Sequence, residues 1–246
     1  MKKKIVVFTG AGISAESGLK TFRDADGLWE QHRIEDVATP MAWEKDRELV
    51  LEFYNQRRKD VLRAQPNAAH LALARLDACF EVVIVTQNID DLHERAGSKN
   101  IIHLHGQILK SRSTADADLL YDCTVDIRPG DRCELGSQLR PHVVWFHEAV
   151  PMMDDACAAA MEADIFLVTG TSLQVYPAAG LINYVPHLSK KILVDPNIPE
   201  INGMKNIEMI EATATTGIPS LVERLINDYG KAPGIEILNP FKRDES

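Results

Sequence analysis

The sequence predicts an α/β protein whose main domain is a Rossmann-type parallel sheet assembled from discontinuous segments. Three observations support this fold class. An apolar run at residues 5–8 is typical of a buried parallel strand. The run ends in the glycine turn Gly10-Ala11-Gly12. Further apolar runs at 80–86, 165–169 and 191–195 alternate with helical segments, as in α/β folds.

The composition excludes several classes of protein. A net charge of -9, from 27 basic and 36 acidic residues, argues against non-specific nucleic-acid binding. No apolar run approaches membrane-spanning length, and residues 1–4 lead into a strand rather than into a signal peptide's apolar core. The four cysteines contain no C-x-x-C pair, which favours reduced thiols. We therefore expect a cytoplasmic enzyme with neither nucleic acid nor membrane as its partner.

The glycine turn that ends the first strand fits a phosphate-binding fingerprint. Gly10, Gly12 and Ala15 match G-x-G-x-x-G/A, in which backbone N–H groups approach a pyrophosphate. A purely structural turn is about equally compatible with this pattern alone. No acidic second strand follows roughly 20 residues later, as a dinucleotide-binding unit would require. We expect the segment around Phe22 and Arg23 to lie over the ligand instead.

The remaining elements follow from periodicity and apolar runs. Helices are predicted at 46–62, from residue 66, before 161, near 178–184 and at 218–225. Strands are predicted at 80–86, 101–104, 141–146, 165–169 and 191–195. The polar segment between Gly106 and Arg140 is predicted to be an irregular excursion out of the core. Because about fifty residues separate the first two convincing strands, we assign the intervening helices to a second lobe.

Two further motifs give the chain a family resemblance. The strand at 80–86 ends in Thr86-Gln87-Asn88-Ile89-Asp90, and the next short strand is followed by His105-Gly106. Taken alone, these are a strand end with an Asn/Asp turn and a histidine capping backbone groups. Together with residues 6–24, however, they resemble the motifs of the sirtuins, a family of NAD-dependent protein-lysine deacylases. The departures are Lys20 and Thr21, where the family usually has Pro and Asp.

The resemblance implies that NAD is bound and consumed. It places Asn88 and Asp90 at the nicotinamide, Gln87 at the nicotinamide ribose, and Asp195 at the adenosine ribose, where the family more often has Asn. It also places Ala214 beside the adenine. The full set of implied NAD-binding residues is Gly10, Ala11, Gly12, Phe22, Arg23, Gln87, Asn88, Ile89, Asp90, Gly170, Thr171, Ser172, Asp195 and Ala214.

The resemblance also implies the chemistry. Asn88 and His105 are the expected catalytic residues, with His105 as general base. A histidine suits this task because its unperturbed pKa of about 6.5 leaves it largely neutral near pH 7. His103, two residues earlier in the strand, is the less suitable base. The acyl-lysine oxygen would displace nicotinamide, and the products would be lysine and O-acyl-ADP-ribose.

The substrate-binding residues are inferred in the same way. The segment Val144-Trp145-Phe146-His147-Glu148 resembles the family's V-x-F-G-E, in which Val144 and Phe146 would pair with an acyl-lysine peptide. Residues Val175 and Tyr176 would flank its other side. A histidine replaces the usual glycine at position 147. Its side chain would narrow the mouth of the acyl-lysine channel or alter the sequence preference, and both alternatives stay open.

One pair of residues predicts the type of acyl group. Tyr54 and Arg57 lie at i and i+3 of the helix at 46–62, so they share one face. An aromatic ring packed beneath a solvated arginine is the ordinary alternative. The pair resembles, however, the Tyr-x-x-Arg of the class III sirtuin subgroup that removes succinyl, malonyl and glutaryl groups, and Ala38 matches its small pocket residue. We therefore predict desuccinylase and demalonylase activity beside deacetylase activity.

The resemblance fails at the zinc ribbon that most sirtuins contain. Cys123 and Cys133 have nine residues between them, and Ser113 stands where a first cysteine is expected. A structural zinc site needs four ligands, so we predict a degenerate zinc-ribbon-like excursion without metal.

The sequence therefore predicts two domains and one main activity. The NAD-binding domain comprises residues 1–28, 78–106 and 140–230, the small domain 29–77 and 107–139, and the C-terminal tail 231–246. NAD and acylated lysine side chains of proteins should meet between the two domains. The alternatives are a mono-ADP-ribosyltransferase, a non-catalytic NAD-binding sensor and, least favoured, a dehydrogenase, for which the chain lacks a Tyr-x-x-x-Lys pair.

Overall fold

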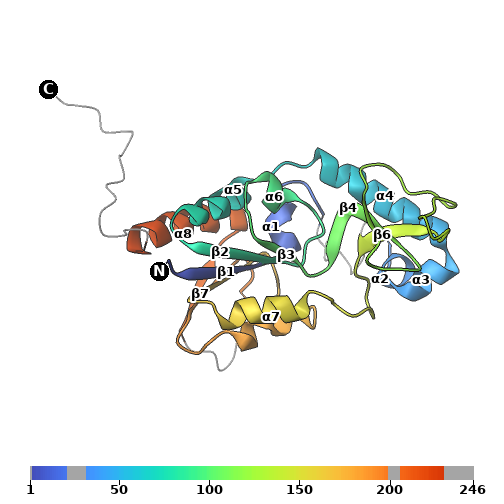
Figure 1. Ribbon diagram of the computed structural model, residues 1–246. Coiled ribbons are helices and arrows are strands. Elements are labelled where there is room, and N and C mark those ends of the chain that lie inside the picture. The colour runs from blue at the N-terminus through green and yellow to red at the C-terminus, as the bar shows by residue number, and fades with distance from the viewer. Residues whose placement is uncertain (1, 21–31, 199–205, 230–246) are drawn as a thin grey trace.

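A six-stranded parallel sheet forms the centre of the larger part of the protein (Figure 1). The computed structural model describes residues 2–20, 32–198 and 206–229. The strands lie in the order β3-β2-β1-β7-β8-β9, which is the strand order of a Rossmann fold. They are β1 (Lys4–Thr9), β2 (Glu81–Thr86), β3 (Ile101–His103), β7 (Ile165–Thr169), β8 (Lys190–Asp195) and β9 (Ile207–Glu211). The predicted fold class is confirmed.

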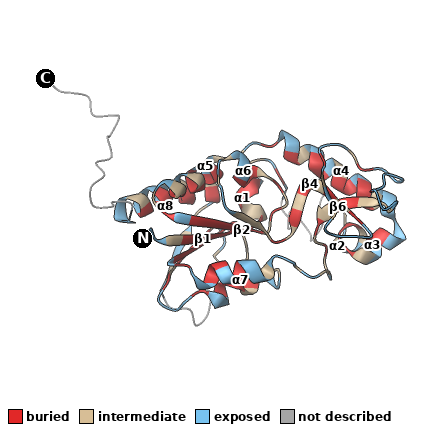
Figure 2. Cartoon of the chain, viewed as in Figure 1, coloured by how far each residue is buried: buried red, intermediate tan, exposed pale blue. Residues whose placement is uncertain are grey.

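Helices cover both faces of this sheet, so its central strands are buried on both sides (Figures 1 and 2). One face packs on α5 and α8, and the other packs on α7 and η2. The helices of this part are α1 (Ala11–Ala15), α5 (Ala68–Arg75), η1 (Leu76–Ala78), α6 (Leu92–Arg95), α7 (Met153–Met161), η2 (Ala178–Tyr184) and α8 (Ala214–Tyr229). This two-sided burial explains why the strands are nearly continuous apolar runs in the sequence.

The two central strands β1 and β7 end in turns that touch each other. The backbone N–H of Gly12 donates to the carbonyl of Gly170 at 2.8 Å. Gly170 has a φ of 64°, and a Cβ there would lie 2.2 Å from the backbone nitrogen of Ile13. A Cβ on Gly10 would lie 2.7 Å from the Cβ of Thr171. The glycines are therefore required for this close approach, which lies where the strand order reverses and such sheets bind ligands.

The smaller part combines helices and a three-stranded antiparallel sheet. Its elements are α2 (Ile34–Val37), α3 (Pro40–Lys45), α4 (Arg47–Arg63), β4 (Gly106–Ser113), β5 (Leu120–Asp122) and β6 (Leu139–Val143). They share one cluster of buried side chains, to which Tyr54 of α4, Ile108 of β4 and Trp145 all contribute. The segments before residue 68 and after residue 105, which are distant in the sequence, thus pack against each other in one cluster.

Three details of the predicted elements are wrong. The segment 106–140 is not irregular, because β4 and β5 pair within it; a register shift between Gly106 and Ser111 interrupts the alternation that would have indicated a strand. The strand predicted at 141–146 ends at Val143. The strand β9 was missed because, as an edge strand, it carries charged residues and is only partly buried. Within the described residues, no helix is long and apolar enough to cross a membrane.

Candidate active site

A cavity of about 560 Å³ opens at the carboxyl ends of the central strands and extends to α4 of the smaller part. Most of the residues predicted from the sequence line it. These are Gly10, Ala11, Gly12, Ala38, Tyr54, Arg57, Gln87, Asn88, Ile89, Asp90, His105, Val144, Phe146, Gly170, Thr171, Ser172, Val175, Asp195 and Ala214. Side chains from distant parts of the chain therefore share a single cavity, which is large enough for an extended ligand.

Three predicted residues stand apart from this cavity. Phe22 and Arg23 lie outside the described residues. Tyr176 is 74% exposed and is not among the residues that line the cavity, although its neighbour Val175 is. Its predicted contact with a peptide therefore remains a prediction.

A hydrogen-bond network fixes the loop that follows β2. The side-chain amide of Asn88 donates to Ser14 Oγ at 3.0 Å, and Ser14 in turn donates to Asp90 Oδ2 at 3.0 Å. The backbone N–H of Leu92 donates to the other oxygen of Asp90 at 3.1 Å. Burial raises the pKa of Asp90. The loop thus carries a buried amide and a buried carboxyl group held at fixed positions, as recognition of a carboxamide requires.

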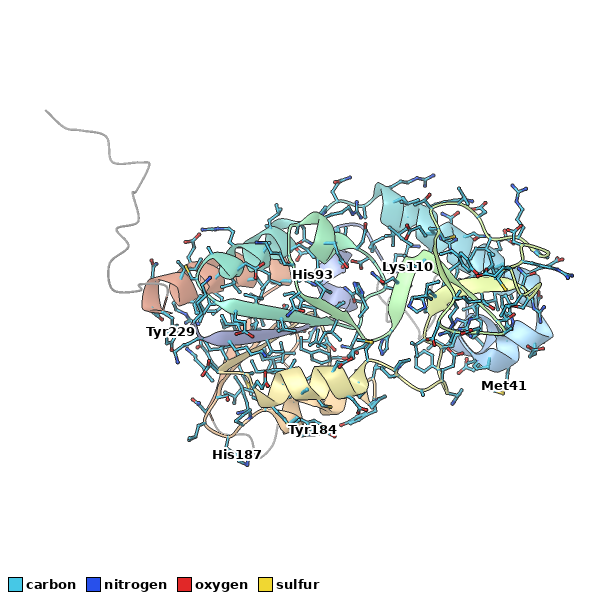
Figure 3. The ribbon with its side chains drawn as sticks, viewed as in Figure 1. Met41, His93, Lys110, Tyr184, His187 and Tyr229 are labelled. Carbon is cyan, nitrogen blue, oxygen red and sulfur yellow. The ribbon has the colours of Figure 1, made fainter. Side chains whose placement is uncertain are left out.

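The base of this loop rests on a second, fully buried network. Thr9 Oγ1 donates to Thr86 Oγ1 at 2.8 Å, and His93 Nε2 lies 3.1 Å from Thr9 Oγ1. Because the single hydroxyl proton of Thr9 is used on Thr86, His93 donates through Nε2. Burial lowers the pKa of His93 well below its ordinary value, so the ring is neutral. His93 belongs to α6 (Figure 3). Its hydrogen bond with Thr9 therefore ties this helix to the ends of β1 and β2.

His105 has the tautomer that a general base requires. Its Nδ1 lies 3.0 Å from the backbone oxygen of Gln87. A carbonyl oxygen only accepts hydrogen bonds, so Nδ1 carries the proton and Nε2 carries the lone pair in the neutral ring. Burial lowers the pKa of His105, against a smaller opposite effect of this hydrogen bond. His105 is therefore neutral near pH 7 and able to accept a proton.

The end of the cavity beyond His105 is formed by α4 and the segment after β6. Tyr54 and Arg57 lie on the same face of α4 and are both buried. Arg57 Nη2 donates to the backbone oxygen of Lys20 at 2.8 Å. Burial raises the pKa of Tyr54, so its phenol keeps the proton that it can donate. A buried guanidinium beside a buried phenol is suited to a carboxylate.

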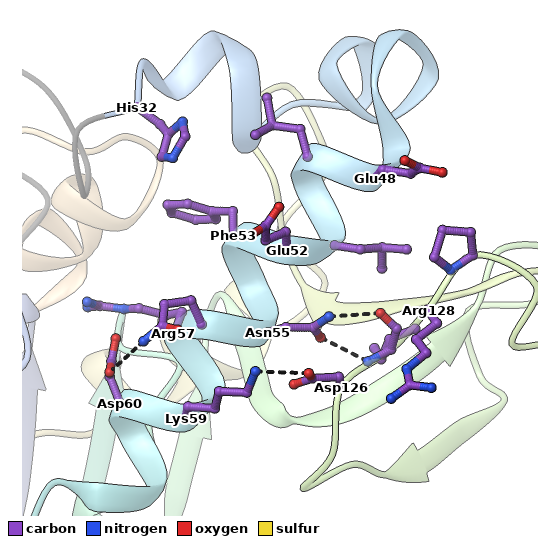
Figure 4. Close-up of a pocket in the computed structure, with 15 residues that line it drawn as sticks. His32, Glu48, Glu52, Phe53, Asn55, Arg57, Lys59, Asp60, Asp126 and Arg128 are labelled. Atoms are coloured by element: carbon purple, nitrogen blue, oxygen red, sulfur yellow. Dashed lines mark hydrogen bonds and ion pairs between the residues drawn. The ribbon is translucent and has the colours of Figure 1, made fainter.

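Arg57 also borders a second cavity, which lies along α4 and the loop before β6 (Figure 4). This cavity measures about 850 Å³, and Phe53, Asn55 and Asp126 are among its lining residues. The side-chain amide of Asn55 donates to the backbone oxygen of Ile127 at 2.9 Å and accepts from its N–H at 2.9 Å (Figure 4). These bonds join α4, the helix that carries Arg57, to the loop before β6 and so hold the helix in place.

His147 occupies a backbone conformation that favours glycine. Its φ is 70°, in the left-handed region. This explains why a glycine is usual at this position of the V-x-F-G-E motif that the segment resembles. The side chain is exposed and is not among those lining the cavity. Beside it, Glu148 accepts from the backbone N–H of Trp145 at 2.7 Å and pairs with Arg140 at 2.6 Å. The glutamate of the motif thus fixes the segment that contains Val144 and Phe146.

The opposite end of the cavity contains two acidic residues. Asp195, at the end of β8, is half-buried, and burial raises its pKa. Glu16 was not predicted; its carboxylate accepts from the backbone N–H of Thr215 at 3.1 Å and from the hydroxyl of Thr213 at 3.3 Å. Glu16 therefore joins the end of α1 to the start of α8, beside Ala214. Ala15 of the glycine fingerprint also lines the cavity, and the further lining residues that the sequence did not indicate are Ser14, Leu19, Val61, Val143, Pro196, Asn197 and Thr213.

Side-chain hydrogen bonds hold the cysteine-containing excursion together. Ser113 Oγ lies 2.8 Å from Ser137 Oγ, and Cys133 Sγ lies 3.3 Å and 3.1 Å from these two oxygens. Cys123 Sγ instead donates to the backbone oxygen of Val125 at 3.4 Å. Within the described part of the chain, no three His, Cys, Asp or Glu side chains form a group that could hold a metal ion.

We expect the protein to keep its stability in the presence of a metal chelator. The cluster of Ser113, Cys133 and Ser137 joins the end of β4 to the turn before β6 through hydrogen bonds between side chains. A thermal melt with and without EDTA should give the same midpoint, and elemental analysis should find no stoichiometric zinc. One zinc per chain, lost on chelation together with a fall in the midpoint, would contradict this prediction.

Comparisons with known proteins find relatives that match most of the chain. The family model described as the Sir2 family matches residues 10–177. A Helicobacter pylori protein named NAD-dependent protein deacylase is 47% identical over 224 residues, which cover 91% of this chain and 98% of the relative. The solved structure of a Sir2 homologue–NAD complex matches with a TM-score of 0.84 and 39% identity, covering 93% of this chain and 91% of the other. A complex of a Sir2 homologue variant with 2′-O-acetyl ADP ribose matches with a TM-score of 0.85 and 38% identity, covering 94% and 95%.

Proposed function

The chain belongs to the Sir2 family, and we infer from that premise that it is an NAD-dependent protein deacylase acting on acylated lysine side chains. One observation of the site carries this conclusion. A neutral His105, with its proton on Nδ1, lines the same cavity as the glycine turns and the Gln87–Asp90 loop. A base, a carboxamide-binding loop and a pyrophosphate-binding turn are the parts that transfer of an acyl group to ADP-ribose requires.

In the reaction, NAD is a substrate rather than a resident cofactor. Asn88 and Asp90 hold the nicotinamide, which leaves as the acyl-lysine oxygen bonds to C1′ of the ribose. The Nε2 atom of His105 accepts a proton from the ribose hydroxyls, and the 2′-oxygen then bonds to the acyl carbon. Addition of water releases the lysine, and the acyl group remains on the ribose as O-acyl-ADP-ribose. Nicotinamide is the other product.

The cavity supports removal of dicarboxylic acyl groups as well as acetyl. Tyr54 and Arg57 would bind the distal carboxylate of a succinyl or malonyl group, and the buried Ala38 leaves space beside them. A mono-ADP-ribosyl transfer or a non-catalytic NAD sensor would have no use for this pair.

The other predicted roles complete the proposal. Gln87, Thr171 and Asp195 would bind the two riboses, Phe22 and Arg23 would cover NAD, and Val144, Phe146, Val175 and Tyr176 would contact the peptide. We retain the division into an NAD-binding domain and a small domain, but shift its bounds so that α5 (Ala68–Arg75), which packs on the parallel sheet, belongs to the first domain and β6 (Leu139–Val143), which pairs with β4, to the second. The four free cysteines favour a reducing compartment such as the cytoplasm.

Mass spectrometry of acyl-lysine peptides tests the function. Acetylated and succinylated peptides incubated with NAD should lose 42 and 100 mass units, about the masses of the two acyl groups replaced by hydrogen. A His105→Tyr variant should leave them intact. Peptides that gain ADP-ribose, or that remain unchanged with the wild-type protein, would support a transferase or a sensor instead.

The pH dependence of the reaction should follow His105. Burial lowers its pKa, and the base works only when it is neutral. We therefore expect the rate of deacylation to remain constant as the pH falls from 7.5 through about 6.5, the ordinary histidine value, and to decrease only at lower pH. Rates at saturating peptide across pH 5 to 8 would measure this, and a decrease already centred above about 6.5 would contradict it.

A further inference from the structure

A second histidine contacts the loop that holds the nicotinamide. His103 ends β3, two residues before His105, and is not among the residues that line the described cavity. Its Nδ1 lies 3.3 Å from the backbone oxygen of Asn88, and its Nε2 lies 2.6 Å from Oε1 of Glu94. The ring therefore bridges the backbone of the Gln87–Asp90 loop and a carboxylate of α6.

The two contacts fix the orientation of the ring. A carbonyl oxygen only accepts hydrogen bonds, so Nδ1 of His103 donates to Asn88. Although burial raises the pKa of Glu94, the hydrogen bond from His103 lowers it below its ordinary value, so this carboxylate is ionised and also accepts. Both ring nitrogens of His103 therefore face oxygen acceptors, the carbonyl of Asn88 and the carboxylate of Glu94.

The two histidines hold consecutive carbonyl groups of the same loop. His105 donates to the oxygen of Gln87, and His103 donates to the oxygen of Asn88. On its other side, the Asn88 side chain is held by Ser14. The direction of the Asn88 side-chain amide in the cavity therefore depends on the position of the Asn88 backbone. His103 is the side chain that holds the backbone carbonyl of Asn88.

We propose that His103 is a positioning residue for the reaction and that Glu94 orients it. The Glu94–His103 pair holds the backbone of Asn88 so that its side chain meets the nicotinamide. This inference rests on the proposed function, because it takes the Gln87–Asp90 loop as the nicotinamide site. His103 does not touch the reacting atoms and transfers no proton.

Two nearly isosteric substitutions separate the contacts of His103. An asparagine places its amide nitrogen near the position of Nδ1 and keeps the donor to Asn88, whereas a glutamine places it near Nε2 and keeps only the donor to Glu94. We expect His103→Gln to lower kcat/KM for NAD by about fivefold, as for the loss of one hydrogen bond, and His103→Asn by less than about twofold. Glu223→Gln, which removes the exposed ion pair with Arg75, is the matched control and should change nothing.

Nicotinamide exchange distinguishes positioning from proton transfer. Incorporation of labelled nicotinamide into NAD, with acyl-peptide present, reports on the first step, which needs no base. His103→Gln should lower exchange and deacylation equally, because both need the nicotinamide in place. A deacylation defect without an exchange defect, or equal activity of the Asn and Gln variants, would overturn the proposal.

Hydrogen exchange of the protein without ligands tests the same contact independently of activity. Amides 87–91 should exchange faster in His103→Gln than in His103→Asn, with the thermal midpoint unchanged within about 2 °C. Equal exchange in the two variants would overturn the role of His103 even if the wild type deacylates peptides. Faster exchange in His103→Gln, with no deacylation by the wild type, would refute the proposed function alone.

Discussion

Deacylation by a His105→Asn variant is expected to fall by about 10²- to 10⁴-fold, the usual contribution of general acid–base catalysis. The amide nitrogen of asparagine lies near the position of Nδ1, so the hydrogen bond to the Gln87 oxygen can be kept while the basic nitrogen is removed. The rate of deacylation of an acetylated peptide with saturating NAD would measure the loss. The reason for the large effect is that no other neutral histidine of the described chain lines the cavity.

The same variant provides its own control. Labelled nicotinamide should still exchange into NAD in the His105→Asn protein, because Asn88 and Asp90 keep their places. Loss of exchange to the same extent as deacylation would show that His105 only supports the loop. A variant that deacylates within about threefold of the wild type would contradict its assignment as the base.

An Arg57→Met variant is expected to lose about 100-fold in kcat/KM for succinylated peptides and little for acetylated ones. Methionine keeps most of the length of the side chain but removes the charge that would pair with the distal carboxylate, and truncating one partner of a buried charged pair has effects of this size. The relevant observation is that Arg57 is buried and lines the cavity together with Tyr54. Paired rates with acetyl and succinyl peptides of one sequence would measure the change.

Arg63→Met is the matched control for this prediction. Arg63 ends the same helix, and its side chain is 76% exposed. Its Nη1 lies 3.9 Å from Oδ1 of Asp60, with which it forms a surface ion pair. Its substitution should alter neither activity. If Arg57→Met left succinyl turnover intact, or lowered both activities equally, the assignment of the acyl pocket would be wrong.

Much of the site could be predicted because its residues are contiguous in sequence and follow strands. The glycine turn, the Gln87–Asp90 loop and His105 each come directly after an apolar strand, and parallel strands bring their carboxyl ends to one edge. The pair Tyr54 and Arg57 was visible for a similar reason, since positions i and i+3 of one helix share a face. Local spacing placed these residues together, and the resemblance to the sirtuins supplied their roles.

The residues that were missed depend on contacts between distant segments. Ser14 is one of several small residues after the glycine turn, and only the folded loop shows that it joins Asn88 to Asp90. Glu16 resembles any exposed helical glutamate until its contact with Thr215, 199 positions away, is known. His103 was judged only by its place in the strand, which says nothing of a carboxylate on α6.

The smaller part was the least predictable for a physical reason. Its sheet is short, and the register shift in β4 breaks the alternation by which strands are identified. Serine and cysteine side chains stabilise its loops, and such hydrogen bonds leave no spacing pattern comparable to paired zinc ligands. The strain at His147 was equally hidden, because only the backbone shows that this position has a positive φ.

The most direct test of this account is the mass of the nucleotide formed when the protein deacylates a peptide. Because the cavity holds the glycine turns, His105 and the acyl pocket together, the acyl group should pass to the ribose of NAD. Mass spectrometry should find one O-acyl-ADP-ribose and one nicotinamide for each lysine released, with a succinyl group on the ribose when the peptide is succinylated. Free carboxylic acid with intact NAD, or ADP-ribose attached to protein, would contradict the account.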